Sequence, residues 1–75
     1  MSQGIRDGAA VRRERMMMIL EFVRSNPGAS VDRIQREIAW RTGLTPKRIS
    51  HYIMELVELK RLRAEGQGFK VADRA

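Results

Sequence analysis

The four residues Gly43-Leu44-Thr45-Pro46 constrain the fold of this chain more than any other feature of its sequence. Glycine adopts a left-handed backbone at low cost, so Gly43 predicts the end of the helix that precedes it. The Thr45 hydroxyl can accept hydrogen bonds from free N–H groups at the start of a following helix, and Pro46 loses no hydrogen bond as its first residue. Residues 38–56 are therefore predicted to form a helix, a tight turn and a second helix.

Apolar residues at helical spacing predict three helices in all. They run from Ala9 to about Ser25, from about Val31 to Thr42 with Ser30 as N-cap, and from about Pro46 to Leu59. The residues predicted to face a common core are Met16, Ile19, Leu20 and Val23 in the first helix, Val31, Ile34, Ile38 and Ala39 in the second, and Ile49, Tyr52, Ile53 and Leu56 in the third.

After Leu59 the apolar period changes from that of a helix to two, which predicts a short hairpin turned by Gly66-Gln67-Gly68. Its apolar face would carry Leu62, Ala64, Phe69 and Val71. The predicted fold class is mainly α with a small β-hairpin, a three-helix bundle plus a two-stranded wing. A chain of 75 residues has room for one core, so residues 9–72 are predicted to form one domain, with a flexible leader at 1–8 and a frayed tail at 73–75.

The charge balance favours a polyanionic partner. Fifteen Lys and Arg against nine Asp and Glu give a formal net charge of +6 and a sequence pI near 11.1. The chain has no cysteine, and this excludes disulfides and thiolate metal sites. No apolar run approaches the roughly 20 residues that cross a membrane, and residues 1–8 lack the apolar segment of a signal peptide. We therefore expect a cytoplasmic protein without a membrane partner.

Catalysis and cofactor binding are not expected. His51 is the only histidine, and no acidic residue or cysteine stands at metal-ligand spacing beside it. A single histidine also leaves little from which to assemble a nucleophilic site, and the chain contains no Gly-rich phosphate loop. The sequence predicts no enzyme, no metal, no cofactor and no small-molecule ligand.

The start of the third helix carries the main candidates for nucleic-acid contact. At 100° per residue its polar side contains Lys47, Ser50 and His51, with Arg48 at the flank, opposite the predicted core stripe. These could all be solvated surface residues, the usual fate of charges on an exposed helical face. Their clustering at an electropositive helix N-terminus favours binding to bases or phosphates instead. Arg63 and Lys70, on the outward face of the hairpin, could contact phosphates.

Trp40 is a separate candidate. It lies 200° around the second helix from Ile38, so it points away from the face that buries this helix. An exposed tryptophan is typical of a dimer or partner contact. The alternative is that it packs under the N-terminal arm without a function.

The segment from Glu37 to Leu59, EIAWRTGLTPKRISHYIMELVEL, resembles the winged helix-turn-helix regulators of bacteria and archaea, in the compact form of the MarR, ArsR and Lrp-like groups. The resemblance covers about Met16 to Val71. It implies that the helix at 46–59 enters the major groove and that the hairpin at 62–72 touches the flanking backbone or minor groove. The DNA contacts that it implies are Thr45, Lys47, Arg48, Ser50 and His51 on the helix and Arg63, Gln67 and Lys70 on the wing. Lys60 and Arg61 stand where these families often have glycine, so the end of that helix is strained or built differently.

The leading hypothesis is a double-stranded DNA-binding protein, most plainly a transcription regulator. A homodimer is a further hypothesis, because one small domain reads few base pairs. One alternative is a protein-interaction winged helix in a replication, transcription or chromatin assembly, with Trp40 as anchor. Another is recognition of RNA or of unusual DNA structure by the same basic face.

Overall fold

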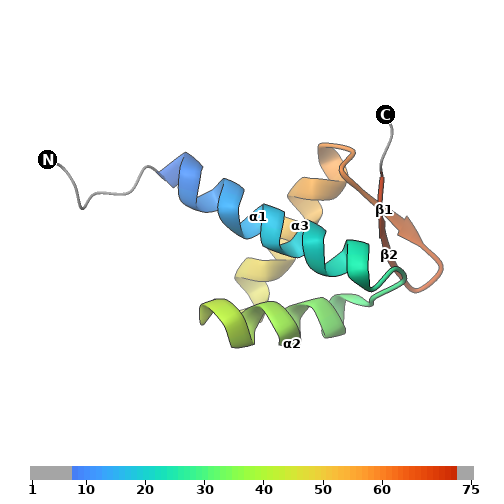
Figure 1. Ribbon diagram of the computed structural model, residues 1–75, viewed down its shortest axis with the longest axis horizontal. Coiled ribbons are helices and arrows are strands. Elements are labelled where there is room, and N and C mark those ends of the chain that lie inside the picture. Colours follow the sequence, from blue (N-terminus) through green and yellow to red (C-terminus); the bar gives the residue numbers. More distant parts are fainter. Residues whose placement is uncertain (1–7, 73–75) are drawn as a thin grey trace, which may run out of the picture.

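The computed structural model describes residues 8–72, where three helices are followed by a two-stranded antiparallel hairpin (Figure 1). The helices are α1 (Gly8–Ser25), α2 (Val31–Thr42) and α3 (Pro46–Glu58), and the strands are β1 (Leu62–Glu65) and β2 (Gly68–Val71). The predicted fold class is confirmed, and the arrangement is compatible with a winged helix. Residues 1–7 and 73–75, expected to be a leader and a tail, lie outside the described residues, whereas Gly8 is the first residue of α1 and not part of a leader.

The predicted helix caps are confirmed. The Ser30 hydroxyl accepts from the Arg33 N–H at 3.2 Å at the start of α2, and the Thr45 hydroxyl accepts from the Arg48 N–H at 3.2 Å at the start of α3. Gly43, with φ of +79°, is the left-handed C-cap of α2, and its N–H donates to the Ala39 carbonyl. The tight turn between α2 and α3 therefore follows from local chemistry on both of its sides.

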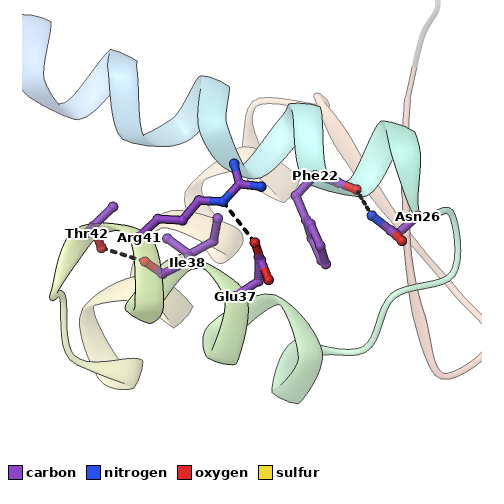
Figure 2. Close-up of polar contacts among 6 residues, drawn as sticks. All are labelled: Phe22, Asn26, Glu37, Ile38, Arg41 and Thr42. Carbon is purple, nitrogen blue, oxygen red and sulfur yellow. Dashed lines mark hydrogen bonds and ion pairs between the residues drawn. The ribbon is translucent and has the colours of Figure 1, made fainter.

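Side chains also close the backbone where α1 and α2 end (Figure 2). The Thr42 hydroxyl donates to the Ile38 carbonyl at 2.7 Å and accepts from the Leu44 N–H at 3.1 Å, so it links the last turn of α2 to the residue after Gly43. The Asn26 amide donates to the Phe22 carbonyl at 2.9 Å just after α1. The Thr42 hydroxyl gives the Leu44 N–H a partner, and the Asn26 amide adds a second donor to a carbonyl that already accepts from the Asn26 backbone N–H.

The core lies between the three helices and the base of the hairpin. Its residues are Ile19, Val23, Ala29, Ile34, Ile38, Ile49, Tyr52, Ile53, Leu56 and Leu62, and no polar or charged residue is buried within residues 8–72. All four core positions predicted in α3 are buried. Such a core stabilises the fold through apolar burial alone, at roughly 1.5–3 kcal/mol for each large side chain.

One predicted core position of α2 is wrong. Val31 is 36% exposed, although it shares the helical face of Ile34 and Ile38, which are both fully buried. Val31 is the first residue of α2 and precedes the first core residue of that helix by almost one turn. The helix therefore begins beyond the edge of the core, which periodicity alone does not reveal.

The hairpin has the predicted apolar face but buries less of it than expected. Its register pairs Leu62 with Val71 and Ala64 with Phe69, across a two-residue turn in which Gly66 has φ of +63°. Leu62 is buried, whereas Ala64, predicted to lie on the apolar face, is exposed. Burial decreases along β1 because the strand runs away from the helices toward the turn (Figure 1).

A short backbone pairing that the sequence did not predict fixes the hairpin to the α1–α2 connection. The Gly28 N–H donates to the Phe69 carbonyl at 2.8 Å, and the Phe69 N–H donates to the Ala29 carbonyl at 3.0 Å. A Cβ atom added at Gly68 would lie 2.0 Å from the Gly28 carbonyl oxygen, so this approach requires glycine.

Lys60 occupies the left-handed position just after α3, where the sequence predicted a cap that is strained or built differently. It has φ of +63°, and its N–H donates to the Val57 carbonyl at 3.0 Å while the Arg61 N–H donates to the Leu56 carbonyl at 2.8 Å. These two bonds make a Schellman cap with a lysine in the left-handed position. The sequence left open whether this helix end is strained or built differently. The structure shows the first: the cap has the ordinary hydrogen bonds, and Lys60 is strained.

Candidate nucleic-acid interface

The first two turns of α3 present a compact group of exposed polar side chains. Lys47, Arg48 and His51 are exposed, and the adjacent Thr45 is exposed as well, with its hydroxyl oxygen accepting a hydrogen bond as the N-cap. We call Lys47, Arg48, Ser50 and His51 the α3 face. The helical period places the α3 face opposite the buried residues Ile49 and Ile53, so its position is fixed by the core.

The charge of the α3 face is positive and not compensated locally. The first turn of α3 contains no acidic residue, and within residues 8–72 neither Lys47 nor Arg48 forms an ion pair. The acidic residues of α3, Glu55 and Glu58, lie at its other end, where Glu55 is 3.9 Å from Arg12. The helix N-terminus adds its own positive partial charge and favours an anion there.

Ser50 differs from the other members of the α3 face because it is half-buried and already has a partner. The Gln35 amide nitrogen on α2 donates to the Ser50 hydroxyl at 2.6 Å and to the Pro46 carbonyl at 3.1 Å. Gln35 was missed at the sequence level. Its only local signal is its place next to the core residue Ile34, and the packing of α2 on α3 brings it to Ser50 from 15 positions away.

The basic residues of the wing are paired with an acidic residue. Glu65 lies 3.3 Å from the Arg63 guanidinium and 3.2 Å from the Lys70 ammonium. Gln67 is exposed in the turn. The pairing could have been anticipated, since Arg63 and Glu65 are two residues apart on one strand and therefore share a face.

The structure does not bring the wing residues to the α3 face. Arg63 and Lys70 are cross-strand partners and line a shallow hollow with Val23 and Pro27 at the end of α1. Within residues 8–72 no hydrogen bond or ion pair connects them to Lys47, Arg48, Ser50 or His51. The predicted contacts therefore form two groups, one on α3 and one on the hairpin.

Trp40 is 87% exposed on α2, as its helical angle predicted. Shallow hollows flank it on two sides, one lined by Gln35, Arg36 and Pro46, the other by Phe22 and Arg33. Arg36 pairs with Asp32, and the Arg33 guanidinium lies 5.7 Å from the centre of the Phe22 ring. The indole therefore lies in the open, with guanidinium groups nearby.

Arg41, the residue after Trp40, is directed elsewhere. Its guanidinium bonds to Glu37 at 2.9 Å, and both side chains rise from α2 toward α1 (Figure 2). Arg41 also lines a hollow with Met17, Met18 and Glu21 of α1. Its charge is therefore separate from the α3 face, which makes it a useful control position.

The described residues meet the requirements of neither a metal site nor a membrane-spanning helix. Within residues 8–72 no three His, Cys, Asp or Glu side chains are grouped so that they could hold a metal ion. None of the three described helices has the length and hydropathy needed to span a bilayer.

Comparison with known proteins adds no relative. No protein-family model matches the sequence, and no curated protein or solved structure gives a significant match.

Proposed function

We propose that this protein binds double-stranded DNA through α3 and acts as a transcription regulator. The observation that carries the proposal is the unpaired positive charge of Lys47 and Arg48 at a capped, exposed helix N-terminus. A helix of this kind fits the major groove, where arginine and lysine bind guanine edges and phosphates. The net charge of +6 supports the same partner by long-range attraction. The wing is proposed to contribute backbone contacts through Arg63, Gln67 and Lys70.

A titration of labelled duplex DNA over a salt series tests this proposal. We expect the logarithm of the binding constant to fall linearly with the logarithm of salt concentration, because neutralised phosphates release counterions. In Arg48→Ala, affinity should fall and the salt slope should become shallower by about 1 if Arg48 contacts a phosphate. Duplex RNA of the same sequence, run in parallel, tests the RNA hypothesis.

Arg41→Ala is the matched control, because it removes the same charge from a side chain that pairs with Glu37 and lies toward α1. Its salt slope should stay that of the wild type. The proposal fails if wild-type protein does not bind duplex DNA at low salt, or if Arg48→Ala and Arg41→Ala have equal effects.

The second candidate function is a protein-interaction winged helix, and the exposure of Trp40 favours it. Trp40, which is 87% exposed, leaves a large apolar surface in contact with water, and tryptophan is enriched among residues that dominate protein interfaces. Self-association is the simplest form of this candidate. Sedimentation equilibrium of the wild type and Trp40→Ser over a concentration series tests it: a wild-type dimer that the substitution dissociates supports a Trp40 interface, and two monomers exclude a homodimer through Trp40.

A further inference from the structure

The bond between Gln35 and Ser50 links α2 to the α3 face and has a fixed direction. The Gln35 side chain approaches two oxygen atoms, the Pro46 carbonyl at 3.1 Å and the Ser50 hydroxyl at 2.6 Å, with the same terminal atom. A carbonyl oxygen has no hydrogen to give, so the atom that faces it must be the amide nitrogen. The same nitrogen therefore donates to Ser50, and the Ser50 hydroxyl is the acceptor.

This direction determines what the Ser50 hydroxyl can do next. A serine hydroxyl has one hydrogen to donate, and accepting from Gln35 does not use it. Within residues 8–72 this hydrogen has no acceptor, because no hydrogen bond runs from Ser50 to another group. Thr42 shows the usual alternative, since its hydroxyl donates to the carbonyl four residues earlier, that of Ile38, at 2.7 Å.

The equivalent acceptor for Ser50 is the Pro46 carbonyl, and Gln35 occupies it. Gln35 thus acts on Ser50 twice: it donates to the hydroxyl oxygen, and it competes for the nearby carbonyl. Both effects favour a hydroxyl hydrogen that points away from the helix backbone. Ser50 shares the helical face of Lys47, at i−3, and Met54, at i+4, which are both exposed.

We propose that Gln35 is a positioning residue that makes Ser50 a hydrogen-bond donor toward DNA. The inference rests on the proposed function, because it concerns how the α3 face meets its ligand. The group that Ser50 recognises is an acceptor: a purine N7, a guanine O6 or a thymine O4 in the major groove, or a phosphate oxygen. The exocyclic amines of cytosine and adenine are donors, so they cannot pair with this hydrogen.

A double-mutant cycle tests whether Gln35 acts through Ser50. The preferred duplex is first selected from a random-sequence library, and its affinity is then measured for the wild type, Ser50→Ala, Gln35→Met and the double variant. Ser50→Ala should weaken binding by roughly two- to tenfold, the worth of one hydrogen bond. Gln35→Met keeps a similar side-chain volume without a donor and should cause a comparable loss. The double variant should bind DNA as tightly as the single variant with the lower affinity, because both substitutions remove the same contact.

Modified duplexes distinguish the two sources of the acceptor. Replacing a purine by its 7-deaza analogue removes one N7, replacing guanine by 2-aminopurine removes O6, and replacing thymine by 5-methyl-2-pyrimidinone removes O4. A methylphosphonate removes the charge and one acceptor oxygen of a single phosphate. The modification at the contacted position should weaken wild-type binding and leave Ser50→Ala unaffected. An effect of a base analogue assigns a base contact, and Ser50→Ala should then also relax base preference at that position. A methylphosphonate effect assigns a phosphate contact without a change of preference.

The outcomes separate this inference from the proposed function. If wild-type protein does not bind duplex DNA, the proposed function fails and the inference fails with it. If the wild type binds but Ser50→Ala binds equally well, or the two substitutions have additive effects, only the inference is overturned. Thermal unfolding of each variant checks that its fold is retained. Should Gln35→Met not fold, the comparison of Ser50→Ala with wild type on modified duplexes still decides whether Ser50 donates to DNA.

Discussion

Single residues set the ends of the helices. Lys60 does so in a left-handed conformation that is unfavourable for a residue with a Cβ atom. Ser30, Gly43 and Thr45 each have the chemistry that their cap position needs, so their roles could be read from the sequence. Lys60 occupies a left-handed position, φ of +63°, that favours glycine. Its two neighbouring hydrogen bonds, from Lys60 to Val57 and from Arg61 to Leu56, hold it there.

Replacing Lys60 by glycine should therefore stabilise the protein. The left-handed conformation costs a residue with a Cβ atom about 1 kcal/mol, and glycine removes this cost while leaving both cap hydrogen bonds in place. Urea unfolding of Lys60→Gly should show a free energy of unfolding higher by about 1 kcal/mol. Lys60→Ala is the control, because it removes the charge but keeps the strain, and it should leave stability nearly unchanged. Equal values for both variants would contradict this account.

The elements of this fold differ in how far local sequence determines them. The α2 bounds and the start of α3 agree with the sequence predictions because caps and periodicity act within a few residues. The pairing of Gly28 and Ala29 with Phe69 joins segments 40 residues apart and involves too few residues to show a period. For the same reason, Lys47, Arg48 and His51 could be placed on an exposed face from helical angle alone, whereas the Gln35–Ser50 bond could not.

The hairpin's attachment gives a prediction at the level of elements. In Gly68→Ala the added methyl group would lie 2.0 Å from the Gly28 carbonyl oxygen. Either the α1–α2 connection or β2 must move to accommodate it. We expect a loss of stability at the upper end of the roughly 1–3 kcal/mol typical of overpacking. Gly66→Ala is the comparison, because it has open space around it and should cost only about 1 kcal/mol for its positive φ. Thermal or urea unfolding measures both, and equal losses would show that the hairpin is not held at Gly28.

Over the whole molecule, the basic side chains behind the net charge of +6 differ in whether an acidic partner neutralises them. Arg36, Arg41, Arg63 and Lys70 are paired with acidic side chains, whereas Lys47 and Arg48 are not paired within the described chain. Exposed pairs of this kind contribute little to stability, with a median of roughly 0–1 kcal/mol. Their larger effect is on the field that an approaching polyanion meets, because they offset the positive charge of Arg63 and Lys70 but not that of Lys47 and Arg48.

Glu65→Gln tests this distribution. It frees Arg63 and Lys70 together, so DNA affinity at low salt should rise and the salt slope should become steeper by up to about 1.8 if both cations reach phosphates. Glu21→Gln removes one negative charge from α1 and serves as the control. A slope in Glu65→Gln that equals that of Glu21→Gln would remove the wing from the proposed interface.

The exposure of Trp40 has a spectroscopic consequence. It is the only tryptophan in the chain, and its indole already lies almost entirely in water in the folded state. Its emission should therefore be red-shifted, open to quenching by iodide, and scarcely altered by urea, so tryptophan fluorescence will follow the unfolding of this protein poorly. The same property makes the indole a reporter of whatever covers the outer side of α2, because removing water from that surface should shift its emission to the blue.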